Sequence, residues 1–305
     1  MIIPKPPHGS ADWLRARWAD ENGNRRVSAS DAASIYGLHP FKTREQYAAE
    51  LMAPQPPQPV APNEAMDRGN RLEPVMIDWV SDKLGKKITT PEVLYENNRM
   101  IATLDGMAED GTIVEIKTYN KQWNGVLPDH WRIQGIQQAI CAGSDVVIWG
   151  IFDSSLSLHL YEQKITSDEV AEHKAAVAKW LENIDLDMPP EGVSWSYATV
   201  SSRYSEPTMK SIEVGPKGKE ILDRLRHVKS ESKSYAELED RLKAEFCELM
   251  EGAEQATIDG NVVATWKSQS RSSFDSKAFK AANPDLAKEY TKTINIRIFT
   301  TKGER

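Results

Sequence analysis

The stretch "TIVEIKT", residues 112–118, places two charged side chains inside a run that is otherwise typical of a buried strand. Apolar residues stand at both odd and even positions of this run, which indicates a strand covered on both faces. Side chains two apart in a strand share a face, so Glu115 and Lys117 lie side by side. A buried carboxylate is costly without a compensating partner. The pair is therefore either an internal salt bridge or part of a functional site.

Composition narrows the class of protein. The chain has 305 residues, of which 40% are hydrophobic and 27% charged, as in a globular protein with a sizeable core. Its net charge of −7 argues against a surface coated in basic charge, although local basic grooves remain compatible with it. Cys141 and Cys247 are far apart, which excludes a disulfide framework and a four-cysteine metal site. We see neither a signal peptide nor a membrane span, so we expect a cytoplasmic protein.

The first part of the chain reads as mainly helical, from cap residues and apolar spacing. The helices are expected over residues 10–19, 27–37, 43–51 and 63–85, with Pro74 as a kink or restart in the last. Between them, residues 54–62, "PQPPQPVAP", carry five prolines. This segment is expected to form an exposed, polyproline-like connection.

Strands and helices alternate further along, which predicts an α/β domain. The strands are expected over residues 93–96, 99–105, 112–118, 146–152 and 156–165, and the helices over 128–143 and 166–184. Beyond about residue 205 a charged helix over 216–250 is too long for a compact core. A hairpin over 256–267 and a terminal strand over 294–302 follow it. We therefore predict a core over residues 1–203 and an extension over 204–305 that contacts other subunits, DNA or a partner.

The E-x-K pattern alone is uninformative, because it occurs four times in this chain. The pairs beginning at Glu172 and Glu231 fall on predicted helices, where positions two apart point in different directions. The pair Glu162 and Lys164 lies at a strand end near Asp153, but no second inward polar group follows it. Context therefore favours Glu115 and Lys117.

Asp105 completes the arrangement, because a hairpin would bring it beside Glu115. Two carboxylates at that spacing form a hard oxygen site suited to Mg²⁺ or Mn²⁺. Lys117 would then hold or activate an attacking water. Glu73, on the inward side of the preceding helix, could reach the metal, and Gln134 lies on the following helix. Together these groups supply what a phosphodiester hydrolase needs.

A family resemblance follows from these residues. Asp105, the ten-residue step to Glu115, and Lys117 resemble the PD-(D/E)xK nuclease signature. Six segments in their usual order resemble the YqaJ-type viral recombinases, the family of phage alkaline exonucleases that includes lambda exonuclease. They are "DWLRAR" (12–17), "VSASDAA" (27–33), "GNRLE" (69–73), "LDG" (104–106), "VEIKT" (114–118) and "HWRIQGIQQAICAG" (130–143). Trp131 departs from the family's usual tyrosine, and the segment between Arg17 and Val27 is longer.

The resemblance implies a fold with a central mixed sheet flanked by helices. It implies Mg²⁺-dependent, 5′-to-3′ digestion of linear double-stranded DNA, with two ions per site and Mn²⁺ as a substitute. The products would be 5′-mononucleotides and a 3′ single strand for a single-strand annealing protein. A ring-shaped homo-oligomer, such as a trimer, is also implied.

The resemblance assigns roles to individual residues. Asp105 and Glu115 would be metal ligands, with Glu73 bound directly or through water and the backbone carbonyl of Ile116 as a further ligand. The remaining roles fall to residues that hold water or phosphate: Lys117 and Gln134 at the scissile phosphate, and Arg17 and Ser30 at the terminal 5′-phosphate. An exposed arginine and a helix N-cap are the plain alternatives for the last two.

Two other functions remain open at the sequence level. The first is an endonuclease of the same fold that cuts within duplexes or at branches. The second is a non-catalytic scaffold that binds DNA ends or protein, with Glu115 and Lys117 as a structural pair.

Overall fold

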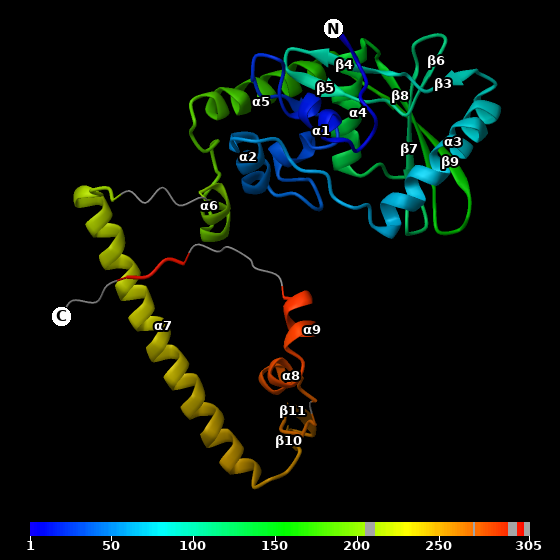
Figure 1. Cartoon of the computed structure of the whole chain (residues 1–305). Coiled ribbons are helices and arrows are strands. Elements are labelled where there is room, and N and C mark those ends of the chain that lie inside the picture. The colour runs from blue at the N-terminus through cyan, green and yellow to red at the C-terminus, as the bar shows by residue number, and fades with distance from the viewer. Residues whose placement is uncertain (205–210, 271, 292–297, 302–305) are drawn as a thin grey trace. The chain divides into compact units, whose positions relative to one another are not determined.

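The computed structural model describes residues 1–204, 211–270, 272–291 and 298–301. The chain divides into two compact units, Met1–Ser205 and Glu206–Arg305. The first is drawn in blue to green in Figure 1, and the second in yellow to red. Among the described residues, no helix is both long and apolar enough to cross a membrane.

Several helices of the first unit begin at a residue whose side chain caps them. The side chains of Ser10, Thr43, Asn63 and Thr166 each accept a hydrogen bond from a backbone N–H of the first turn, which satisfies a donor that the helix itself leaves unpaired. The helices are α1 (Ala11–Trp18), α2 (Arg44–Met52), α3 (Glu64–Leu84), α4 (Asp129–Ala142), α5 (Ser167–Asp185) and α6 (Tyr197–Arg203). These include five of the predicted helices, and α3 runs through Pro74. Residues 54–62 form neither helix nor strand, as predicted.

Two sheets make up the rest of the first unit. A five-stranded sheet has the order β3-β6-β7-β8-β9, and β7 and β8 are parallel while its other pairs are antiparallel. Its strands are β3 (Ile88–Thr89), β6 (Gly106–Ala108), β7 (Ile113–Thr118), β8 (Val146–Phe152) and β9 (Leu158–Lys164). A four-stranded sheet has the order β1-β4-β5-β2, with strands β1 (Ile2–Pro4), β4 (Val93–Asn97), β5 (Met100–Ala102) and β2 (Val27–Ser28). The predicted α/β class with a mixed sheet flanked by helices is confirmed.

Strand β7 is covered on both faces, as its apolar residues indicated. Val114 and Ile116 pack in a cluster with Met76 and Val80 of α3. Ile113 belongs to the larger cluster that contains much of α4. Figure 1 shows α3, in cyan, alongside the sheet. Glu115 therefore lies on the face of β7 that carries Ile113, toward α4.

Helix α4 lies very close to the five-stranded sheet. A Cβ atom at Gly135 would overlap the side-chain oxygen of Gln163 and stand 3.0 Å from the ring of Trp149. Only a hydrogen atom fits there, so this glycine sets how near α4 comes to β8 and β9.

Two sequence predictions about the first unit are wrong in part. Residues 27–37 do not form one helix: Val27 and Ser28 pair in parallel with Met100 and Ile101, and a short 3-10 helix, η1 (Ala32–Tyr36), follows. The strand expected over 99–105 ends at Ala102, and a separate strand, β6, begins at Gly106. In the first place, pairing with the distant Met100 and Ile101 overrides the local pattern. In the second, two neighbouring hairpins divide the predicted strand.

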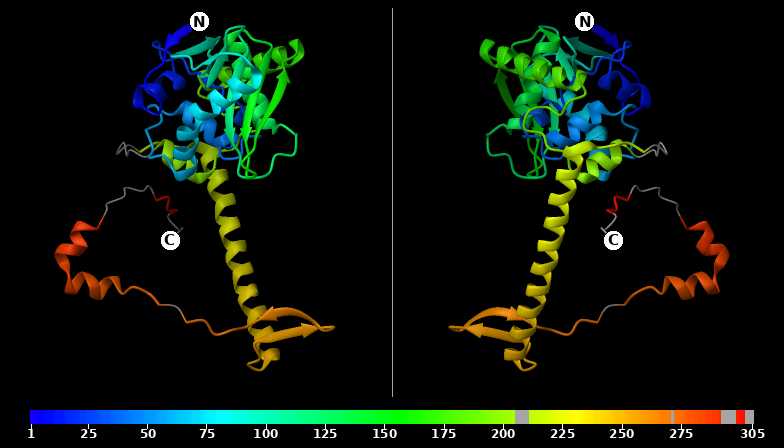
Figure 2. Two further views of the ribbon diagram at one scale, coloured as in Figure 1. Left: turned by 90° about the vertical axis from the view of Figure 1, so that its right-hand side faces the viewer. Right: turned by 90° about the vertical axis from the view of Figure 1, so that its left-hand side faces the viewer.

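The second unit begins with the long helix α7 (Gly215–Met250), followed by the hairpin of β10 (Gln255–Ile258) and β11 (Asn261–Thr265). Asp259 and Gly260 turn this hairpin with positive φ angles of 50° and 80°. Two short helices follow, α8 (Ser276–Ala282) and α9 (Pro284–Glu289). Figure 2 shows α7, in yellow, leading into the hairpin. The long helix and hairpin are confirmed, whereas the strand predicted over 294–302 lies largely outside the described residues, and residues 298–301 form no strand.

Candidate active site

The hairpin of β6 and β7 brings Asp105 to Glu115. Gly106 pairs with Val114, so Asp105, one residue earlier, stands opposite Glu115. Asp105 Oδ2 accepts a hydrogen bond of 2.8 Å from the backbone N–H of Ile116. The predicted neighbourhood is therefore present, although β6 and not the strand over 99–105 creates it.

Glu115 lies at the centre of a network of donors. Its Oε1 accepts hydrogen bonds from Lys117 Nζ at 2.7 Å and from Gln134 Nε2, and its Oε2 accepts one from Gln138 Nε2 at 2.6 Å. The Glu115 side chain is only 4% exposed and that of Lys117 is 23% exposed. We call Glu73, Asp105, Glu115, Lys117 and Gln134 the carboxylate cluster.

The carboxylate cluster carries more negative than positive charge. Burial raises the pKa of Asp105 well above its usual range, and the charge of Glu115 raises it further. The half-buried Glu73, on α3, has a raised pKa for the same two reasons, so it shares the electrostatic environment of Glu115. Burial alone would lower the pKa of Lys117, but the charges of Glu115 and Asp105 outweigh burial and raise it.

These residues fit a hard divalent cation in donor type and in charge. A cation would relieve the repulsion that raises the pKa of Asp105 and Glu73. In the part of the chain that the structure describes, no group of three or more Asp, Glu, His or Cys is arranged to hold a metal ion. Mg²⁺ is commonly held by only one or two carboxylates, with waters and substrate phosphates completing its shell. Asp105 and Glu115 suffice for that arrangement.

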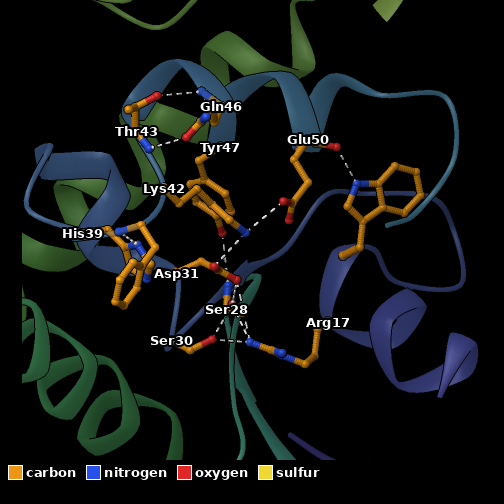
Figure 3. Close-up of polar contacts among 12 residues, drawn as sticks. Arg17, Ser28, Ser30, Asp31, His39, Lys42, Thr43, Gln46, Tyr47 and Glu50 are labelled. Atoms are coloured by element: carbon orange, nitrogen blue, oxygen red, sulfur yellow. Dashed lines mark hydrogen bonds and ion pairs between the residues drawn. The ribbon is translucent and has the colours of Figure 1, made fainter. Parts of the chain in front are cut away.

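A second polar cluster surrounds Arg17 (Figure 3). The guanidinium of Arg17 donates to Ser28 Oγ at 2.9 Å and to Ser30 Oγ, and lies 3.7 Å from the Asp31 carboxylate. Lys42 Nζ bridges Asp31 and Glu50 at 2.8 Å each. We call Arg17, Ser28, Ser30, Asp31, Lys42 and Glu50 the arginine cluster.

The structure excludes the two simpler interpretations, an exposed arginine for Arg17 and a helix N-cap for Ser30. Arg17 is not an exposed arginine, because its side chain is 15% exposed and its guanidinium lies 4.1 Å from the ring centre of Trp13. Ser30 is not a helix N-cap, because Asp31 holds that position at η1. Its hydroxyl instead accepts from Arg17.

Charges balance in the arginine cluster. Burial would raise the pKa of Asp31, but the charges of Lys42 and Arg17 lower it below its usual value. Burial would likewise lower the pKa of Lys42, but Asp31 and Glu50 raise it. Each charge therefore has an opposite charge beside it.

Helix α4 links the strands that carry the two clusters. Gln137 is on α4, the helix that also carries Gln134. Its side chain donates to the carbonyl of Val27, the neighbour of Ser28, at 2.8 Å and to the carbonyl of Ile101 at 3.2 Å. The side-chain oxygen of Gln137 lies 3.0 Å from Nε2 of the buried His173. Burial lowers the pKa of His173 to about 4, so it is a neutral partner at neutral pH.

Sequence reasoning missed several of these contacts. Gln138 was near the predicted site, but only the structure places it on Glu115 and on the Thr103 carbonyl. Ser28 stands in the same "VSAS" segment as Ser30 and could have been found there. No spacing in the sequence connects Lys42 with Asp31. The rival pair Glu162 and Lys164 lies on the surface, with side chains 52% and 81% exposed.

Comparison with known proteins supports the family resemblance. Residues 12–145 match the family model of the YqaJ-like viral recombinase domain, which confirms the resemblance that the motifs predicted and includes both polar clusters. No match was found among curated proteins.

The chain also resembles solved structures at low identity. An alkaline exonuclease from Laribacter hongkongensis aligns with a TM-score of 0.48 and 22% identity over 58% of this chain and 93% of that one. The same exonuclease in complex with dAMP gives a TM-score of 0.47 and 21% identity over 58% and 93%. A phage-related exonuclease from Haemophilus somnus 129PT aligns with a TM-score of 0.39 and 14% identity, over 54% of this chain and 96% of that one.

Proposed function

Given a YqaJ-like viral recombinase domain over residues 12–145, we propose that this protein is a metal-dependent exonuclease that digests linear double-stranded DNA from its 5′ ends. The observation that carries the proposal is the surplus of carboxylates around Lys117, where burial and then the charge of Glu115 raise the pKa of Asp105. A purely structural salt bridge needs no such surplus, whereas a site for a divalent cation does. The non-catalytic scaffold is therefore the weaker reading.

Asp105 and Glu115 would hold Mg²⁺, with Glu73 bound directly or through water and the carbonyl of Ile116 as a further ligand. When bound, such ions polarise a phosphate oxygen and lower the pKa of water. Two ions per site are proposed, with Mn²⁺ as a substitute.

The surrounding side chains would fix the geometry of the reaction. Lys117 stands beside Glu115 and carries its proton firmly, so its ammonium can hold the attacking water by hydrogen bonding. Gln134 and Gln138 donate to different oxygens of Glu115, which fixes the plane of that carboxylate. Gln134, which is partly exposed, would also contact the scissile phosphate.

The arginine cluster would recognise the terminal 5′-phosphate. Arg17 can present its planar fork to a doubly charged phosphate, and the hydroxyls of Ser28 and Ser30 already lie at its tip. The Asp31 carboxylate, 3.7 Å away, holds Arg17 in place without a close hydrogen bond. Digestion from this end would release 5′-mononucleotides and leave a 3′ strand for a single-strand annealing protein. A ring-shaped homo-oligomer, such as a trimer, would keep the enzyme on its DNA.

The deciding experiment compares linear and covalently closed duplex DNA in Mg²⁺, with each strand of the linear DNA labelled at each end in turn. Linear DNA should lose its 5′ label first, and closed circles should stay intact. Glu115→Ala should reduce cleavage at least about a thousandfold, because it removes a ligand and the acceptor of three hydrogen bonds. Circles cut as fast as linear DNA would replace this proposal with the endonuclease of the same fold.

The 5′-phosphate pocket has a separate test. Duplex with 5′-phosphate ends should be digested about tenfold faster than duplex with 5′-hydroxyl ends, since one charged contact is worth roughly that much. Arg17→Ala should erase most of this difference, while the rate on 5′-hydroxyl DNA changes little. An undiminished preference in Arg17→Ala would move phosphate recognition elsewhere.

A further inference from the structure

An apolar stripe with a seven-residue repeat runs along α7. Five apolar residues form it, and each is at least 54% exposed: Ile221, Val228, Tyr235, Leu242 and Leu249. A strict seven-residue repeat drifts slowly around a straight helix, and only a partner that supercoils with it covers the stripe throughout. A helix of 36 residues with this stripe in water gains little from packing. The stripe therefore indicates a helical partner.

Charges on α7 are segregated along its length. Residues 215–233 carry six basic and three acidic residues, for a net charge of +3. Residues 234–250 carry two basic and five acidic residues, for a net charge of −3. The helix macrodipole favours the opposite order, and α7 has no acidic residue in its first turn and no basic residue in its last. This order destabilises a lone helix, so it indicates a partner whose charges run the other way.

A second copy of α7 in antiparallel orientation meets both requirements. Around Tyr235, Ile221 and Leu249 are equally distant, and so are Val228 and Leu242. Two antiparallel copies related by a twofold axis at Tyr235 would therefore place apolar residues opposite one another. The same arrangement sets each positive half against the negative half of the other copy, whereas parallel pairing aligns halves of like charge.

We propose that α7 is a self-association surface that pairs antiparallel with α7 of a second copy of this chain, with the twofold axis at Tyr235. The contact is isologous, so it joins chains in pairs, including chains that belong to two different rings. It does not depend on the nuclease function proposed for the first unit.

Disulfide cross-linking of the full chain tests the orientation. In a Cys247→Ser background, a tagged Val228→Cys chain and an untagged Leu242→Cys chain are coexpressed and mildly oxidised. Antiparallel pairing predicts a mixed disulfide between the two chains and little cross-linking of either variant alone. Homodimers of each variant alone would show parallel pairing and overturn the proposal, as would no disulfide in any mixture.

Light scattering of the full chain tests the surface itself. Leu242→Asp should weaken association at least tenfold and halve the mass of any assembly held by α7. Ser230→Asp, two residues from Val228 and off the stripe, is the matched control and should leave the mass unchanged. Equal behaviour of the two variants would overturn the proposal.

Charge-reversal variants test the antiparallel register independently. Arg226 and Glu245 lie nearly equally far from Tyr235 and 19 residues apart, too far to meet within one helix. Arg226→Glu or Glu245→Arg alone should weaken the dimer several-fold, and the double variant should restore it. Additive weakening in the double variant would count against the antiparallel register.

Discussion

The carboxylate cluster and the arginine cluster contain the same kinds of group, but they differ in charge balance. In the first, Glu73, Asp105 and Glu115 surround one cation, Lys117, and the pKa of Asp105 is raised. In the second, two carboxylates face two cations, and the pKa of Asp31 is lowered. The difference separates a cluster with a surplus of negative charge, as a cation site would have, from one whose own charges balance.

Replacing the lysine of each cluster should show the difference between the clusters most clearly. Lys117→Ala should lower the cleavage rate at least about a hundredfold, because one preorganised charge at the reacting group is removed. DNA binding measured with Ca²⁺ in place of Mg²⁺ should be largely kept. An equal loss of binding, folding and rate would instead identify Lys117 as a structural partner of Glu115.

Lys42→Ala is the matched change in the arginine cluster. It leaves the half-buried Asp31 with Arg17, 3.7 Å away, as its remaining cation, so the free energy of unfolding should fall by about 2–4 kcal/mol. Urea unfolding measures this loss. A Lys42→Ala chain as stable as the wild type would show that charge balance does not stabilise this cluster.

Neutralising one aspartate in each cluster should have opposite effects on stability. Without divalent cations, Asp105→Asn should raise the free energy of unfolding by about 1 kcal/mol, because it removes the cost of burying that charge and the repulsion by Glu115. Asp31→Asn should lower it by about 2 kcal/mol, because it removes a partner of Lys42. Saturating Mg²⁺ should stabilise the wild type more than Asp105→Asn.

The pH dependence of these variants follows from the pKa directions. The pKa of Asp105 is raised in the fold, so stability present below about pH 4 is lost as pH rises. The advantage of Asp105→Asn should therefore grow with rising pH. The pKa of Asp31 is lowered, so its contribution is full above about pH 4 and is lost as pH falls. An advantage of Asp105→Asn that shrinks with rising pH would contradict the charge surplus.

The smallest expected effect concerns Gln138, which positions Glu115. Gln138→Leu removes the donor to Oε2 of Glu115 while Lys117 and Gln134 keep Oε1. The rate should fall about tenfold, and the Mg²⁺ concentration for half-maximal rate should rise, as for loss of a group that orients a ligand. A lower rate with unchanged Mg²⁺ dependence would make Gln138 merely structural.

Within the carboxylate cluster, the grouping of Asp105, Glu115 and Lys117 could be predicted because its signals are local to one hairpin. The alternation of residues 112–118 fixes the faces of β7, and Asp110 and Gly111 mark the turn that returns Asp105 to Glu115. The segment "VSASDAAS" was misread because small polar residues suit helices and turns alike, and only pairing with Met100 and Ile101 makes a strand of its start. The arginine cluster joins residues up to 33 positions apart, from Arg17 to Glu50, without any periodic signal.

The close packing at Gly135 has a consequence at the level of the gene. Every single-base change in a glycine codon that replaces the glycine without ending the chain introduces a Cβ atom, and here that atom meets the side chain of Gln163. The genetic code therefore offers no conservative step away from this glycine. Each such change requires either that Gln163 give up its hydrogen bonds to Trp149 and Arg132 or that α4, which carries Gln134 and Gln138, move away from the sheet. A residue that touches neither metal nor DNA is thereby as constrained as those that would.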